Sequence, residues 1–200
     1  FLFTGTGYYN YDSGYTPEFQ SLDKFKGQVI HPQKWPKDLN YEDKKVIVIG
    51  SGATAATIVP EISKKSKHVT MLQRSPTYYF PSLDEDRFAN FLKKILPTKF
   101  SYSFIRLRNV LFQQLLYRVR RRFPNFVKRK LIDHVRKMLP NFDIQKHFTP
   151  SYNPWEQRMC LIPNGDLFES LRENRATIVT DHIDEFTPVS YTHLTLPTSN

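Results

Sequence analysis

The feature that most constrains the fold is an apolar run that leads directly into a glycine-rich turn. Residues 46–49, Val-Ile-Val-Ile, are all β-branched, which is typical of a strand buried on both faces of a parallel sheet. Gly50, Gly52 and Ala55 then fill a G-x-G-x-x-A frame. The sequence therefore predicts a strand followed by a tight turn and a helix.

The helix after the turn is expected from Ala53 to about Lys64, and Pro60 should kink it or remove a backbone hydrogen bond. In such a frame the first glycine permits the turn, the second lets the backbone approach a pyrophosphate, and the small third residue packs the helix on the strand. The helix start would present free N–H groups to phosphate. The residues expected to contact a dinucleotide are Gly50, Ser51, Gly52, Ala53, Thr54, Ala55 and Ala56.

A second strand is predicted at 68–73, where folds of this kind recognise the adenosine ribose. An acidic residue after that strand would favour a free 2′-hydroxyl, but this chain has Arg74 and Ser75. Arginine suits a 2′-phosphate because it forms bidentate, charge-assisted bonds. The alternative is a solvated arginine at the end of a strand. We interpret the unit as an NADPH site.

The composition is that of a globular protein, with 40% hydrophobic and 14% aromatic residues among 200. Cys160 is the single cysteine, which excludes an internal disulfide framework and indicates a reducing, cytoplasmic compartment. No run of eighteen apolar residues is present, so we expect no transmembrane helix. The six histidines and one cysteine show no metal-ligand spacing, so no metal site is expected.

Both ends of the chain suggest an interior fragment of a longer protein. The first residue is not Met, and residues 1–9 predict a short strand ending in a glycine turn, followed by a surface loop over 10–24. Residues 189–200 resemble a translated sequencing-library adapter and are excluded from functional reasoning, although a genuine polar tail is the alternative. A credible strand at 176–180 precedes that tail.

Residues 25–36 carry the most specific pattern, F-x-G-x-x-x-H-x-x-x-W-P, with the fixed positions Phe25, Gly27, His31, Trp35 and Pro36. This pattern resembles the fingerprint of type I Baeyer–Villiger monooxygenases. The related monooxygenases that oxidise nitrogen and sulfur usually carry a different aromatic residue at the position of Trp35. Without the fingerprint, His31 and Trp35 would be interpreted as a packed loop with a satisfied imidazole.

The resemblance covers residues 1–187 and is strongest to the ethionamide-activating branch of the family, at 7–19 and 147–158. It implies an α/β fold in which a Rossmann-like NADP-binding domain carries a helical insertion beside a remnant of a second, FAD-binding Rossmann-like domain. The implied divisions are 1–44 for the end of the FAD domain and linker, 45–82 with 146–181 for the NADP domain, 83–145 for the insertion, 182–188 for the return to the FAD domain, and 189–200 for the tail.

Further site residues follow from the resemblance alone. Thr6 and Gly7 lie where the family has its A-T-G turn beside FAD, so they are expected to contact the flavin. Arg158 matches the position of the catalytic arginine. Many relatives have Lys-Arg there, whereas this chain has Gln157-Arg158, which shifts the binding of the NADPH phosphate towards Arg74.

The implied activity is that of a flavoprotein monooxygenase. NADPH reduces FAD, reduced flavin takes up O₂ to form a C4a-peroxide, and attack on a ketone gives an ester or lactone. Arg158 would stabilise the anionic species as a permanent cation. The substrate would be a small ketone or sulfur-containing molecule. Two alternatives remain: an N- or S-oxygenating flavin-containing monooxygenase, and a non-catalytic basic membrane-binding module.

The insertion is strongly basic, with 14 Lys or Arg and one acid between Lys93 and Lys137, and it accounts for the whole net charge of +10. Apolar residues recur at helical spacing, and Pro97, Pro124 and Pro140 divide the segment into two or three helices. Three interpretations are open: a solvated helical face, peripheral contact of residues 93–137 with anionic lipid, and nucleic-acid binding. No nucleic-acid motif accompanies the charge, so we expect no such partner and hypothesise loose membrane association.

Overall fold

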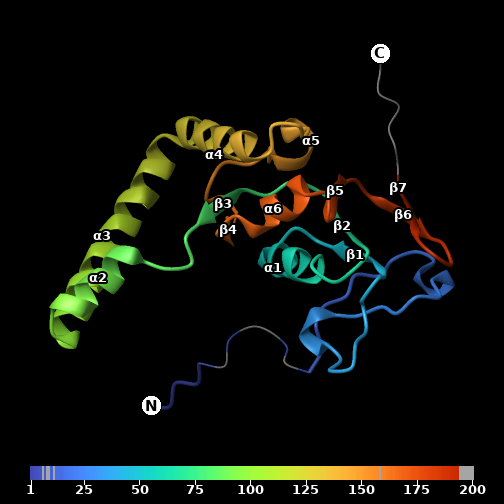
Figure 1. Ribbon diagram of the computed structural model, residues 1–200, viewed down its shortest axis with the longest axis horizontal. Coiled ribbons are helices and arrows are strands. Elements are labelled where there is room, and N and C mark those ends of the chain that lie inside the picture. The colour runs from blue at the N-terminus through green and yellow to red at the C-terminus, as the bar shows by residue number, and fades with distance from the viewer. Residues whose placement is uncertain (6, 8–9, 11, 158, 194–200) are drawn as a thin grey trace. The chain divides into compact units, whose positions relative to one another are not determined.

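The structure, a computed structural model, describes residues 1–5, 7, 10, 12–157 and 159–193 (Figure 1). The chain divides into two compact units. The larger unit comprises Tyr41–Thr180, and the smaller one comprises Phe1–Asn40 together with Asp181–Asn200.

A three-stranded parallel sheet forms the centre of the larger unit, in the order β1-β2-β5. Its strands are β1 (Lys45–Ile49), β2 (His68–Gln73) and β5 (Ala176–Thr180). All three predicted strands are therefore confirmed. Because the strands are parallel, their carboxyl ends meet at one edge of the sheet, where ligands bind in open α/β folds.

The prediction that β1 is buried on both faces is wrong for the residues that the structure describes. None of the five residues of β1 is fully buried, and among the described strands β1 pairs only with β2. Val46 and Val48 pack against the core from one face, whereas Ile49 is 46% exposed on the other. A β-branched run indicates a strand but does not say how many of its sides are covered.

Helices α1 (Ala53–Ile62) and α6 (Asp166–Arg172) pack with the sheet in the core, to which residues 135–148 also contribute. Val59, Met71, Leu167 and Phe168 are completely buried in this core. Pro60 is accommodated inside α1 and is itself buried, and the helix ends two residues later. The predicted helix after the glycine turn is thus confirmed.

A second, two-stranded parallel sheet pairs β3 (Tyr79–Ser82) with β4 (Cys160–Pro163), an element that the sequence did not predict. The chain between these strands forms α2 (Arg87–Ile95), α3 (Thr98–Arg122), α4 (Pro124–Met138) and α5 (Ile144–Phe148). Pro97 caps α3 and Pro124 begins α4, which confirms the division of the insertion at its prolines.

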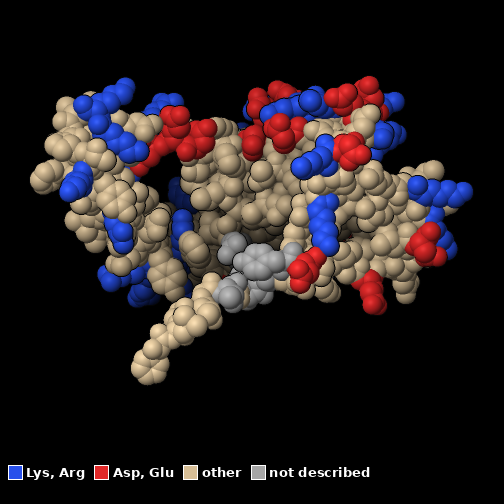
Figure 2. Space-filling view, turned by 90° about the horizontal axis from the view of Figure 1, so that it is seen from below, with Lys and Arg blue, Asp and Glu red and all other residues tan. Residues whose placement is uncertain are grey.

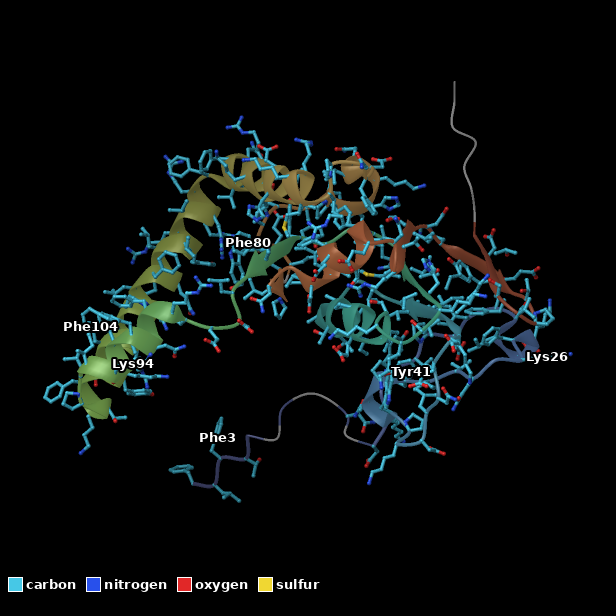
Figure 3. The ribbon with its side chains drawn as sticks, in the orientation of Figure 1. Phe3, Lys26, Tyr41, Phe80, Lys94 and Phe104 are labelled. Carbon is cyan, nitrogen blue, oxygen red and sulfur yellow. The ribbon has the colours of Figure 1, made fainter. Side chains whose placement is uncertain are left out.

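Helices α2 and α3 together form what we call the helical arm, residues 87–122 (Figure 1). The 25-residue α3 buries only Ser101. Lys and Arg side chains are spread over the arm in Figure 2, and Figure 3 labels Lys94 and Phe104 on it. In the part of the chain that the structure describes, no helix is both long enough and apolar enough to span a bilayer.

The smaller unit has little regular structure. It contains the 3-10 helices η1 (Leu22–Lys24) and η2 (Pro32–Lys34) and an antiparallel pair, β6 (Ile183–Phe186) with β7 (Tyr191–His193). β7 lies inside the segment set aside as a tail, whose adapter origin stays a prediction.

The strand predicted within residues 1–9 is wrong for the residues described there. Residues 1–5 and 7 form no strand, and Phe1, Leu2 and Phe3 are exposed (Figure 3). An extended apolar segment becomes a strand only when another strand supplies its hydrogen bonds, and no described segment pairs with this one.

Candidate nucleotide-binding site

The glycine turn lies at the carboxyl edge of the main sheet, beside the end of β2. The N–H of Gly50 donates to the carbonyl of Leu72 at 2.8 Å, which extends the pairing of β1 and β2 by one residue. Gly50 then adopts a φ of 132°, which side chains rarely allow, and a Cβ added at Gly50 or Gly52 would meet no atom within 4 Å. The turn therefore requires glycine at position 50 and leaves the backbone at position 52 open to a ligand.

Helix α1 begins directly after the turn, with Gly52 as its N-cap. Its first helical bond runs from the N–H of Ala56 to the carbonyl of Gly52 at 3.0 Å, so the N–H groups of Ala53, Thr54 and Ala55 precede that bond. Ala55 and Ala56 are buried, and Ala56 belongs to the core cluster that joins α1 to the sheet. The first turn carries no acidic residue, so the positive end of the helix dipole faces outward uncompensated.

The end of β2 is joined to the glycine turn. The hydroxyl of Ser51 donates to the carbonyl of Ser75 at 3.4 Å, which places Arg74 next to the turn. Arg74 is exposed and forms no ion pair with any residue that the structure describes. Its guanidinium is thus available to a phosphate ester held at the same edge.

Two donors from the second sheet contact the turn, and neither was predicted from the sequence. The hydroxyl of Tyr79 donates to the carbonyl of Ser51 at 2.9 Å, and the thiol of Cys160 lies 3.9 Å from the same oxygen. The ring of Tyr79 makes edge contacts with Phe148 and Phe168, with centroids 6.2 and 6.4 Å away. Burial raises the pKa of Tyr79, so its hydroxyl stays protonated and remains a donor.

Beneath the end of β2 a polar cluster joins three segments. The side-chain nitrogen of Gln73 donates to the backbone carbonyl of His147 and to the hydroxyl of Thr180, both at 2.8 Å. Nδ1 of His147 lies 2.7 Å from that same hydroxyl. Burial, followed by the charge of Lys146, lowers the pKa of His147, so the imidazole is neutral at pH 7. The cluster fixes the strand end that carries Arg74.

The segment before β4 is anchored to β3 by tyrosines. The hydroxyl of Tyr78 donates to the carbonyl of Tyr152 at 2.6 Å, and the hydroxyls of Thr77 and Tyr152 are 2.9 Å apart. Burial raises the pKa of Tyr78 to about 12. Further along, the carboxylate of Glu156 accepts from the backbone and side chain of Asn153, bonds that lower its pKa.

The expected catalytic residue, Arg158, lies outside the described residues, and its neighbour Gln157 is exposed. Cys160 follows Arg158 by two residues and approaches Ser51, so this segment passes close to the glycine turn. Trp155 contributes a contact with the arm: the ring of Tyr117 lies 6.3 Å from its ring and the guanidinium of Arg120 lies 5.2 Å from its centroid. Burial lowers the pKa of Arg120.

The fingerprint residues lie in the smaller unit. Phe25 packs edge-on against Phe186 at 6.2 Å, and a Cβ at Gly27 would come within 2.4 Å of the Phe25 ring. A side chain at position 27 would therefore force the ring of Phe25 to move. His31 accepts a bond from the N–H of Gln33 at Nδ1, 3.2 Å, and its ring lies against the Cα of Gly14.

The structure describes three of the four remaining predicted site residues in the smaller unit. Trp35 follows η2 and is 42% exposed, and Pro36 is half-buried. Gly7 has a φ of 74°, as expected for a glycine turn, whereas Thr6 lies outside the described residues. The structure thus brings Gly50–Ala56, Arg74 and Ser75 together in the larger unit, and it keeps the fingerprint and Gly7 within the other unit.

A parallel sheet, an open glycine turn, an unobstructed helix start and an arginine at the next strand end define an α/β domain of the Rossmann-like class. Residues 2–141 match the model of a family described as flavin-binding monooxygenase-like. The chain belongs to this family.

Known relatives agree with that assignment. The chain is 48% identical over 189 residues to a protein named FAD-containing monooxygenase EthA from Mycobacterium tuberculosis, covering 94% of this chain and 39% of the relative. It is 48% identical over 188 residues to a probable FAD-binding monooxygenase, AlmA, from Acinetobacter baylyi, with 94% and 38% covered. The resemblance found in the sequence is confirmed, and the chain spans about two fifths of the length of these relatives.

Solved structures share the fold. OTEMO in complex with FAD and NADP aligns with a TM-score of 0.66 at 19% identity, covering 90% of this chain and 42% of that one. Cyclohexanone monooxygenase from Rhodococcus sp. Phi1 bound to NADP⁺ aligns with a TM-score of 0.63 at 17% identity, with 90% and 41% covered. The predicted α/β, Rossmann-like fold class is confirmed.

Proposed function

We propose that the intact protein is an FAD- and NADPH-dependent monooxygenase of the Baeyer–Villiger type, which inserts one oxygen atom of O₂ into a ketone to give an ester or lactone. The observation that carries this proposal is the open glycine turn with Arg74 beside it. Family membership supports the monooxygenase class, and the fingerprint at 25–36 favours the Baeyer–Villiger chemistry within that class.

The residues of the turn fit the phosphates of NADPH. A Cβ added at Gly50 or Gly52 would meet no atom within 4 Å, so the backbone is open to a pyrophosphate, and the first N–H groups of α1 can donate to it. Arg74, exposed and without an ion pair to any described residue, can hold the 2′-phosphate. When bound, NADPH supplies a hydride and FAD supplies the oxygen-transferring centre.

Arg158 is the residue to which we assign catalysis. A guanidinium keeps its charge at any working pH, so it stabilises negative charge that develops on the substrate oxygen. In a site that excludes water, one such donor contributes about 3–4 kcal/mol to the transition state. Gln157 replaces the lysine common in the family, which leaves Arg74 as the main cation for the ribose phosphate.

The test of the binding mode is Arg74→Ala in the intact enzyme. NADPH affinity should fall by about 1.5–3 kcal/mol because bonds to a charged group are lost, while NADH affinity stays nearly constant. Arg172→Ala is the matched control, since Arg172 is an exposed arginine at the end of α6, before β5 begins. An unchanged preference for NADPH over NADH would remove Arg74 from the site.

The test of the catalytic assignment separates two half-reactions. Arg158→Ala should abolish oxygenated product while flavin reduction by NADPH, followed by stopped-flow absorbance, survives. Equal loss of both half-reactions would contradict the assigned role. Oxygenation of nitrogen or sulfur is the competing chemistry, and analysis of products from a ketone and a thioether offered together distinguishes the two.

A second proposal concerns the basic insertion, which we suggest contacts an anionic bilayer. Apolar residues along α3 are exposed, including Phe104, Leu107 and Leu111 at 52–58%, and Lys and Arg dominate the charged residues among them. Such a surface is complementary to acidic headgroups and an acyl boundary. Co-sedimentation with phosphatidylglycerol liposomes, but not with phosphatidylcholine ones, is expected. No binding even at low salt would reject the proposal.

A further inference from the structure

Tyr79 lies outside the glycine frame, yet its hydroxyl contacts the turn at the peptide bond between Ser51 and Gly52. Its hydroxyl donates to the carbonyl of Ser51 at 2.9 Å, and this carbonyl belongs to the peptide unit that also carries the N–H of Gly52. In a trans peptide the carbonyl and the N–H point in opposite directions. The described chain contains no cis peptide bond. Holding the carbonyl inward therefore turns the N–H of Gly52 outward.

The outward side is where a ligand would lie. The N–H of Gly52 has no hydrogen-bond partner among the described residues, and a Cβ at Gly52 would meet open space. A donor of this kind next to the start of α1 adds to the N–H groups that the helix already presents.

The donor itself is rigidly held. Tyr79 is 2% exposed, its ring is fixed by edge contacts to Phe148 and Phe168, and its backbone pairs with Cys160 in the β3–β4 sheet. A tyrosine with a fixed ring holds its hydroxyl in one place, so the peptide orientation exists before any ligand arrives. Preorganised donors avoid the free-energy cost of reorientation on binding.

We infer that Tyr79 is a positioning residue for the dinucleotide, acting through the Ser51–Gly52 peptide to aim the N–H of Gly52 at a pyrophosphate oxygen. The inference rests on the proposed binding of NADPH at this turn and adds to it a residue from a different sheet. Tyr79 does not touch the ligand, and it serves binding rather than the chemical step.

The experiment uses the intact, FAD-loaded enzyme and two tyrosine variants that each remove one oxygen atom. Tyr79→Phe releases the Ser51 carbonyl. Tyr78→Phe is the matched control, because Tyr78 is equally buried and donates to a backbone carbonyl as well, that of Tyr152. The readout is the dissociation constant of NADP⁺ by calorimetry, with the NADPH dependence of flavin reduction as a second measure.

Tyr79→Phe should weaken NADP⁺ by about five- to tenfold, the loss expected for one ordinary hydrogen bond, while the rate of flavin reduction at saturating NADPH is preserved. Tyr78→Phe should stay within about twofold of the parent, because its bond does not involve the turn. Equal weakening in both variants, or none in Tyr79→Phe, would overturn the inference. If the parent enzyme itself fails to bind NADP⁺, the proposed function fails, and this outcome is distinct from failure of the positioning role.

Discussion

The sheet core and the helical arm belong to the same unit of the chain but treat their apolar side chains in opposite ways. In the core, Val59, Met71 and Leu167 are completely buried. On the arm, Leu107 and Leu115 are 58% and 59% exposed, although both occupy regular helical positions. The difference teaches that hydrophobic spacing specifies a helix, whereas burial depends on which surface another segment covers.

The strongest test of this comparison is a large truncation in the core. Phe168→Ala should lower the free energy of unfolding of the intact protein by about 3–5 kcal/mol, because a fully buried ring leaves a cavity. Urea denaturation followed by circular dichroism measures it. Phe112→Ala, on the exposed face of the arm, is the control of equal chemistry. A similar loss in the free energy of unfolding for both variants would contradict the difference in burial between the core and the arm.

Removal of a contact between the arm and the rest of its unit is expected to lower the free energy of unfolding by an intermediate amount. Trp155→Ala removes an aromatic edge contact with Tyr117 and a cation–π contact with Arg120, so about 1–2 kcal/mol should be lost. Hydrogen exchange should increase at the C-terminal end of α3 while β2 and β5 keep their protection. Exchange that rises throughout the sheet instead would show that Trp155 supports the core.

A smaller effect on stability is expected from a change of pH, through His147 at the carboxyl ends of β2 and β5. The pKa of His147 is lowered by burial, so as pH falls below about 6.5 the unfolded chain takes up the proton first, and stability declines until the folded imidazole is protonated too. His147→Gln should make the thermal midpoint less dependent on pH between 7.5 and 5.5. A slope identical to that of the parent protein would mean that His147 does not contribute to it.

The smallest effect on the free energy of unfolding is expected from a substitution on the exposed surface of the arm. Leu107→Ala is expected to change the free energy of unfolding by no more than about 0.5 kcal/mol, since the side chain is already exposed. The same change should weaken binding to phosphatidylglycerol liposomes. A loss above about 2 kcal/mol in the intact protein would break the comparison, because it would show that another segment buries this face.

The glycine turn could be predicted from the sequence because its requirements are local. A positive φ at Gly50 and a small residue at Ala55 follow from the turn and from the helix packing next to it. The space at Gly27 is also limited by a residue close in sequence, because a side chain there would meet the ring of Phe25. The placement of Arg74 beside the turn followed from the same short unit, because the second strand of the unit ends at Gln73.

Features that depend on distant partners could not be predicted in this way. β3 contains Pro81, which weakens any strand signal, and its partner β4 lies about eighty residues later in the chain. The role of Tyr79 and the cluster around Gln73 therefore emerge only in three dimensions. The exposed face of β1 and the absence of a strand at residues 1–5 have a related cause. In both cases the outcome depends on whether another segment covers or pairs with the residues, which the local sequence does not specify.

The parallel pairing of β3 with β4 brings the two ends of the insertion together. Tyr79 pairs with Cys160, so the two ends of the insertion lie at adjacent points of the larger unit. For a loop closed in this way, each doubling of length costs only about 0.6 kcal/mol of chain entropy. A change in the length of the insertion is therefore expected to cost little stability, because the paired ends of β3 and β4 separate it from the main sheet.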